Sequence, residues 1–154
     1  MALDATALLL NVKKSIRKYF LDNLYTIEGY EVTFDKGFAP PKVQGVEKND
    51  WYSINFIGNN NESKAEQDID IVIASRVDPE GDIVINMRDI LFNYLVGAEG
   101  GQRSITLYNC ANPANLTSIG GMLIIPESAS GIIEAEDSTK YILLPIRLLY
   151  GIKI

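Results

Sequence analysis

The sequence predicts an α+β fold, in which an N-terminal amphipathic helix and a second, short helix pack on one face of a mainly antiparallel sheet. Apolar residues repeat at helical spacing near the N-terminus and again near residue 90. Between these segments, and most clearly at the C-terminus, apolar and polar residues alternate with the period of a strand. The chain has 154 residues, a length typical of one domain, so we expect a single domain over residues 1–154.

The first helix is expected over residues 5–24. Asp4 and Thr6 are acceptable N-caps, and Gly29 interrupts the helical pattern. One stripe of the helix is apolar, as a helix packed on a core requires, and it contains Leu9, Val12, Ile16, Tyr19 and Phe20. The other side is basic, with Lys13, Lys14, Arg17 and Lys18.

A strand-rich stretch follows. Residues 30–34 alternate as a short strand, and residues 37–48, which contain Pro40 and Pro41, form a loop or extended arm because proline cannot donate a ladder hydrogen bond. Residues 51–57 form a strand with Tyr52, Ile54 and Phe56 on one face. Residues 58–61 are strong turn formers, and residues 67–77 form the second strand of a long hairpin, with alternating isoleucines.

The next segments are expected to be a turn, a helix and two strands. Residues 78–81 form a tight turn by composition. The second helix is expected at residues 86–96 with Asn86 as N-cap, although residues 83–85 also suit a strand. Strands follow at residues 104–110 and 122–125, and residues 111–121 and 126–139 are connections.

The last strand has the clearest alternation. One face carries only apolar side chains, which are Ile142, Leu144, Ile146, Leu148, Tyr150, Ile152 and Ile154. The other face is mixed and includes Arg147 and Lys153. This alternation is typical of a sheet covered on one side. Pro145 predicts an edge position or a bulge, since proline lacks the N–H that a central strand uses.

Composition excludes several classes of function. The formal net charge of −6 argues against a protein that coats nucleic acid. We expect neither a signal peptide nor a membrane-spanning segment, which would need a run of about 20 apolar residues. The sequence has no histidine and one cysteine, Cys110, so His-based catalysis and the common zinc sites are unavailable. A buried, unreactive Cys110 is expected. We therefore expect no enzyme activity, no metal and no cofactor.

One alternative interpretation is a metal site. Asp68 and Asp70 share a strand face and could in principle hold Mg²⁺, within an acidic cluster that also contains Glu66, Asp78, Glu80 and Asp82. The simpler interpretation is a solvated hairpin face. Two interpretations also remain for the basic helix face. It fits either a solvated surface or a contact with an acidic neighbour or with DNA.

The order of elements resembles the tail terminator family of long-tailed phages, which includes the lambda tail terminator. The resemblance lies in the N-terminal amphipathic helix, the strand after a Pro-containing loop (51–58), and the turn into alternating isoleucines (67–77). A turn with Pro79 and Glu80, a short helix (86–96) and the long C-terminal strand complete it. Residues 98–139 do not align with the family pattern.

The resemblance implies a structural virion protein of the tail or neck, assembled in the bacterial cytoplasm. It implies a homo-hexameric ring that caps the tail tube, stops its polymerisation and offers a surface for head joining. Its partners would be the tube protein, head–tail connector proteins and, in a contractile tail, the sheath, with DNA only passing through. The candidate contact residues are Phe38, Pro40, Pro41, Lys42, Asn59, Asn60, Asn61, Lys13 and Arg17.

Rival classes remain open. One is another neck, tail-completion or head–tail connector protein of similar topology. The other is a small metal-dependent hydrolase centred on Asp68 and Asp70.

Overall fold

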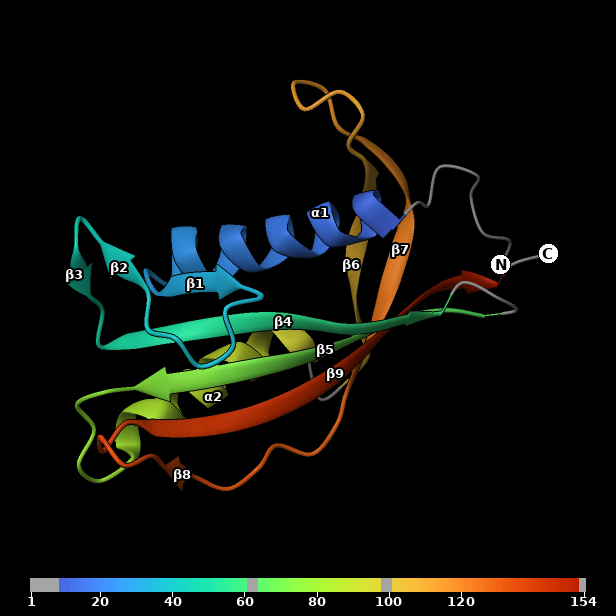
Figure 1. Cartoon of the computed structure of the whole chain (residues 1–154). Helices are drawn as coiled ribbons and strands as arrows, with labels where there is room; N and C mark the ends of the chain where they lie inside the picture. The colour runs from blue at the N-terminus through green and yellow to red at the C-terminus, as the bar shows by residue number, and fades with distance from the viewer. Residues whose placement is uncertain (1–8, 61–63, 98–100, 153–154) are drawn as a thin grey trace.

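The computed structural model describes residues 9–60, 64–97 and 101–152, and at residues 59, 60, 64, 151 and 152 it describes the backbone only. Within these residues the chain forms a seven-stranded sheet in the order β1-β4-β5-β9-β7-β6, with β8 paired to β9 (Figure 1). Strand β1 (Glu31–Phe34) runs parallel to β4 (Asp50–Asn60), and the other pairs in this sheet are antiparallel. The predicted α+β class, with a mainly antiparallel sheet, is confirmed.

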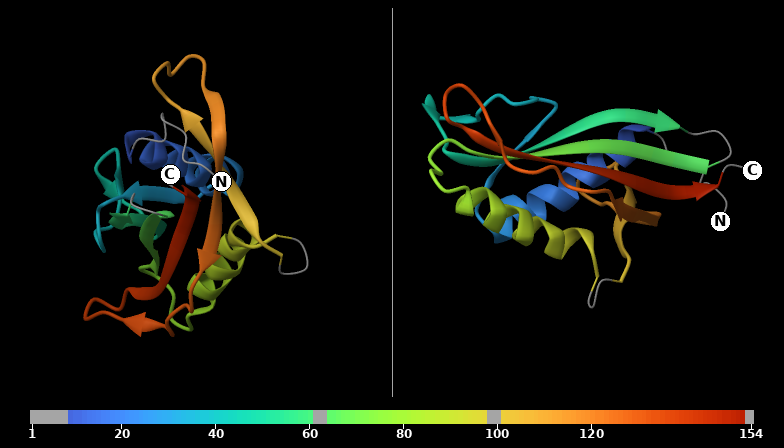
Figure 2. Two further views of the ribbon diagram at one scale, coloured as in Figure 1. Left: turned by 90° about the vertical axis from the view of Figure 1, so that its right-hand side faces the viewer. Right: turned by 90° about the horizontal axis from the view of Figure 1, so that it is seen from below.

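The two helices lie on the same face of the curled sheet (Figure 2). Helix α1 (Leu9–Phe20) and helix α2 (Asp82–Leu95) contribute to one buried cluster together with the inward residues of the strands. At its centre, Ile16 and Phe20 of α1 and Met87 and Leu91 of α2 are fully buried. This inner face of the sheet is the hydrophobic core of the fold.

The first helical segment runs three residues beyond the expected end at residue 24. It continues beyond Phe20 as a π-helical segment, η1 (Leu21–Ile27), and Gly29 then adopts a left-handed conformation with φ of 81°. Val12, Ile16 and Phe20 are buried as predicted, but Leu9 is 44% exposed because it lies at the helix start, beyond the core. The expected caps Asp4 and Thr6, and residues 5–8, lie outside the described part of the chain.

The arm at residues 37–48 contains a small hairpin that the prolines concealed. Strands β2 (Lys42–Val43) and β3 (Val46–Glu47) pair around Gln44 and Gly45. Both of these residues have positive φ, 53° and 78°, which is the geometry of a type I′ hairpin turn. The dipeptide Gln-Gly is a weaker sequence signal for this turn than Asn-Gly. The sequence therefore predicted only a loop or extended arm here.

The long hairpin is formed by β4 and β5 (Lys64–Ser75). The predicted turn at residues 58–61 is wrong for its first part, because β4 runs on through Asn60 with a register shift between Phe56 and Gly58. Asn61 lies outside the described residues. Along β5, Ile69, Ile71 and Ile73 are fully buried, as their alternation predicts.

Helix α2 begins four residues before the predicted position. Its N-cap position is Gly81, and residues 83–85 are helical. The carboxylate of Asp78 accepts hydrogen bonds from the N–H groups of Ile83 (3.2 Å) and Val84 (3.0 Å). These bonds satisfy N–H groups of the first turn, which have no partner inside the helix. Asn86 is therefore not the cap, because the side chain of Asp78, in the preceding turn, accepts the hydrogen bonds of the first helical turn.

The C-terminal half holds more strand than expected. Strand β6 (Arg103–Asn109) agrees with the prediction, but β7 (Thr117–Pro126) begins five residues early and β8 (Ile133–Glu134) lies in the expected connection. Strand β9 (Lys140–Ile152) has the predicted facing, since Ile142, Leu144, Ile146, Leu148 and Tyr150 are all buried.

The expected edge position or bulge at Pro145 is wrong. Strand β9 lies inside the sheet between β5 and β7, and Pro145 pairs regularly with Asp70. The Pro145 carbonyl accepts a hydrogen bond from Glu127 N–H at 3.0 Å, just after β7 ends. In an antiparallel strand the N and O atoms of one residue face the same neighbour. The missing N–H therefore faces the place where β7 leaves, and no bond to β5 is lost.

Candidate interaction surfaces

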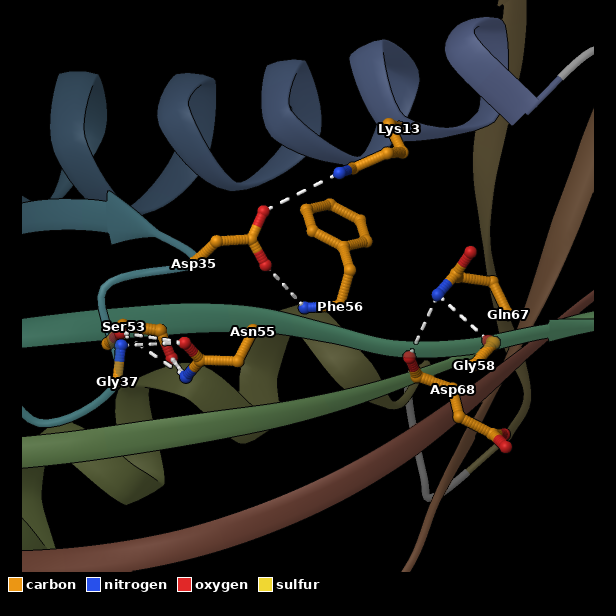
Figure 3. Close-up of polar contacts among 9 residues, drawn as sticks. All are labelled: Lys13, Asp35, Gly37, Ser53, Asn55, Phe56, Gly58, Gln67 and Asp68. Atoms are coloured by element: carbon orange, nitrogen blue, oxygen red, sulfur yellow. Dashed lines mark hydrogen bonds and ion pairs between the residues drawn. The ribbon is translucent and has the colours of Figure 1, made fainter.

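The basic side of α1 is largely occupied by contacts within the chain. Lys13 pairs with Asp35 at 3.5 Å and lies 4.6 Å above the ring of Phe56, and Asp35 also accepts a hydrogen bond from Phe56 N–H at 3.0 Å (Figure 3). Arg17 lies over the same ring at 6.0 Å, and Lys18 pairs with Asp22 at 2.6 Å. The contacts of Lys13 and Arg17 with Phe56 join α1 to β4, whereas the Lys18–Asp22 pair is local to the helical segment.

The arm at residues 37–48 folds back on the outer face of the sheet, away from the helices. Gly37 N–H donates to the Asn55 side chain at 2.9 Å (Figure 3). The ring of Phe38 meets Tyr141 of β9 edge-on, with 5.1 Å between centroids. Of the predicted contact residues here, Phe38 is 53% exposed and Lys42 is exposed, whereas Pro40 and Pro41 are half-buried. Phe38 therefore has an intramolecular role as well as a free surface.

Beneath this arm lies a second, smaller apolar cluster. Trp51, Val72 and Ala74 are buried on the outer face, and Tyr141 and Leu143 pack against them. Beyond the arm, the same face is open and charged. The predicted contact residues Asn59 and Asn60 continue β4 past this region, and only their backbone is described.

The predicted acidic cluster is divided between the two ends of β5. Asp68 and Asp70 lie on the open outer face, where Arg147 Nε contacts Asp68 at 3.1 Å and Glu66 at 3.5 Å. The hydrogen bond to Asp68, followed by the attraction of both carboxylates, raises the pKa of Arg147. Asp78 is buried and binds the start of α2. In the described ranges, no group of three or more His, Cys, Asp or Glu side chains is placed to hold a metal ion.

A hydrogen-bonding role of α1 was not predicted. Strand β6 is an edge strand, and two N–H groups at and just after its end donate to α1: Tyr108 to Ser15 Oγ at 2.9 Å and Cys110 to Asn11 Oδ1 at 3.0 Å. Asn11 and Ser15 are buried and four residues apart, so they share a helix face. In the sequence, the only sign of this role is that Asn11 and Ser15 are polar and lie beside the apolar stripe of the helix. The helix thus protects an edge that could otherwise pair with another strand.

Cys110 is buried, as predicted. Its Sγ lies 3.7 Å from the Tyr108 carbonyl. None of the described helices is long and apolar enough to cross a membrane.

These features define an α+β protein with a curled, mainly antiparallel sheet and helices on its inner face. No protein-family model matches the sequence, and no curated protein matches it. Among solved structures, a chain described as "Virion of native gene transfer agent (GTA) particle" matches with a TM-score of 0.53 and 16% identity. The match covers 96% of this chain and 98% of that chain. A second structure matches with a TM-score of 0.52 and 9% identity, over 92% and 97%. At these identities the likeness establishes the fold.

Proposed function

We propose that this chain is a structural protein of a phage-like tail, and specifically a tail terminator. It forms a ring that caps the tail tube, stops tube polymerisation and presents a surface for head joining. The observation that carries the proposal is the near-complete match in both directions to a chain of a virion particle. The sequence pattern, taken independently, resembles the tail terminator family.

The polar groups of the fold support a structural role. Residues of the acidic cluster and of the basic helix face make contacts within the fold: Asp78 binds the start of α2, Asp68 pairs with Arg147, and Lys13 pairs with Asp35. We infer a protein without catalysis. Its partners are further copies of itself in a hexamer, the tube protein and the head–tail connector, with the sheath added if the tail contracts. It belongs to the virion neck, after assembly in the host cytoplasm.

A second candidate is another neck, tail-completion or connector protein. It is favoured by the description of the similar structure, which names the particle and not a position within it. The position of the gene discriminates the two, because a terminator gene is expected between the head-completion and tail-tube genes.

The direct test is tube length. We expect purified tube protein to polymerise into tubes of uncontrolled length, and the added chain to stop growth and to appear as a cap at one end in electron micrographs. Removal of the gene should give overlong tails without heads. If tubes grow equally long with the chain present and bear no cap, the terminator function is excluded.

A further inference from the structure

Strand β6 lies at the edge of the sheet, so only one of its two rows of main-chain N–H and C=O groups pairs with a strand, β7. In an antiparallel strand the N–H and C=O of one residue face the same neighbour, and successive residues face opposite sides. The N–H of Tyr108 faces α1, where Ser15 accepts it. The extra residue of the register shift lies in β7, so the alternation along β6 continues unbroken. The free row therefore contains Ser104 and Thr106.

Helix α1 covers only the C-terminal end of this free row. There, the N–H groups of Tyr108 and Cys110 donate to side chains of the helix. Ser104 and Thr106 are exposed, and on this side no described residue forms a hydrogen bond with their N–H or C=O groups. The stretch from Ser104 to Thr106 therefore offers two donors and two acceptors at the spacing of a strand.

The open stretch lies in a groove between β6 and the helical segment that begins with α1, which passes beside β6 (Figure 1). The groove has a volume of about 220 Å³. Its wall opposite β6 consists of side chains with polar groups, which are Ser15, Lys18, Tyr19, Asp22 and Asn23. The groove is therefore polar on the helix side and has unpaired main-chain groups on the strand side.

The charged side chains at this groove already have partners within the chain. Lys18 pairs with Asp22 at 2.6 Å. Arg103, the residue before Ser104, donates a hydrogen bond to the Asn93 carbonyl at 2.7 Å. A charged side chain that entered the groove would lose hydration without gaining a free partner of opposite charge. The groove therefore favours short, uncharged polar side chains, such as those of serine and threonine.

We propose that this groove binds an extended, uncharged segment of a partner protein, which adds to β6 as a short strand. The main chain of the segment pairs with Ser104 and Thr106, and its short polar side chains meet the wall formed by α1. Main-chain pairing with an exposed sheet edge is a recurring mode of peptide recognition. A slender segment fits better than a second folded copy, because α1 borders the edge and the open stretch is three residues long. The inference goes beyond the proposed function and does not depend on the place of the chain in a tail.

A model peptide tests the main-chain pairing. The probe is an acetylated and amidated hexapeptide of alternating threonine and serine. Four main-chain hydrogen bonds support weak binding, with a dissociation constant of about 1 mM. In proton–nitrogen NMR spectra the peptide should shift the amide signals of Ser104 and Thr106 and slow their hydrogen exchange.

The matched control is the same peptide with every N–H group methylated, which cannot donate to the edge. It should leave the signals of Ser104 and Thr106 in place. Equal shifts with both peptides, or no shift with either at about 10 mM, would overturn the proposal.

Substitution of the edge gives a second test. Thr106→Pro removes an N–H that faces the groove and leaves the ladder to β7 intact, because proline is tolerated in edge strands. It should weaken peptide binding at least about tenfold, whereas Thr106→Val, which keeps the N–H, should bind within about twofold of the original. Thermal unfolding checks that each variant is folded, and the methylated peptide decides the question if Thr106→Pro is not. A folded Thr106→Pro variant that binds the peptide as tightly as the original contradicts the proposal.

The outcomes are distinct from those of the tube-length test. A chain that caps tubes but does not bind the peptide overturns only this inference. A chain that binds the peptide but leaves tube growth uncontrolled overturns only the terminator function. If hydrogen exchange at Ser104 and Thr106 slows as the protein alone is concentrated, a second copy occupies the edge, which also contradicts the proposal.

Discussion

The inner and outer faces of the sheet are built on different principles. The inner face is mainly apolar and is covered by α1 and α2, and Ile71, Leu144 and Ile146 are essentially inaccessible there. The outer face is divided. One part is covered by the arm over Trp51 and Val72, and the other is open and carries Asp68, Asp70 and Arg147. Two helices cover the inner face along its length, whereas the short arm covers only the part of the outer face around Trp51 and Val72.

The largest expected effect comes from truncating the inner face. Ile146→Ala should lower the free energy of unfolding by about 2–5 kcal/mol, because it removes a buried side chain and leaves a cavity. Ile16→Ala, on the helix that covers the same core, should fall in this range too. Chemical denaturation would measure both.

The neighbouring residue provides the control. Arg147→Ala changes the open outer face and should alter the transition much less than either isoleucine variant, because the Arg147 side chain is 44% exposed. If Arg147→Ala were the most damaging of the three, the assigned facing of β9 would be wrong.

Smaller losses are expected at the edge of β6. Ser15→Ala removes the acceptor of the Tyr108 N–H and should cost about 1–3 kcal/mol, because the site is nearly inaccessible to water. Hydrogen exchange of the Tyr108 amide should also accelerate. Lys14→Ala, one residue away on the exposed side, is the matched control and should leave that exchange rate unchanged.

The buried Tyr52 should make the stability of the fold depend on pH in the alkaline range. Its hydroxyl donates to the Met87 carbonyl at 2.6 Å, and burial is the main cause that raises its pKa far above the ordinary value. Since the folded state holds a proton that the unfolded state loses above pH about 10, the stability from this group is complete below that pH and decreases above it. Tyr52→Phe should cost about 1 kcal/mol at neutral pH and flatten the alkaline loss. An unchanged alkaline slope would contradict this role.

The smallest effect is expected where the arm covers the outer face. Phe38→Ala removes an edge-on contact with Tyr141 and should lower the free energy of unfolding by about 0.5–1.5 kcal/mol. Phe38→Leu, which keeps apolar bulk but not the ring contact, should cost less. A loss as large as that of Ile146→Ala would show that the arm belongs to the main core.

The sequence predicted the inner face well and the connections poorly. The alternating isoleucines of β5 and the even residues of β9 placed the core correctly, since one period sets the facing of a whole strand. The start of α2 was placed too late because its first turn is held by Asp78, which lies before the helix. The hairpin β2–β3 was missed because its turn, Gln44-Gly45, is not a strong hairpin signal.

Contacts between surface residues were also predicted only in part. Proline- and asparagine-rich segments drew attention to Phe38, Pro40, Pro41, Lys42, Asn59, Asn60 and Asn61, and their role as contacts stays a prediction. Nor did the sequence indicate that Gly81 lies against Ile132, because the two residues are far apart in the chain.

What the sequence by itself determined is the fold class and which side of β4, β5 and β9 is buried, because periodicity is a local property that each segment carries alone. The tertiary structure decided which strands are neighbours, why Pro145 is tolerated inside the sheet, and how α1 closes the edge of β6 with Asn11 and Ser15. These features depend on hydrogen bonds between residues as far apart as Asn11 and Cys110. Their partners are chosen by the packing of the whole chain, which no local pattern records.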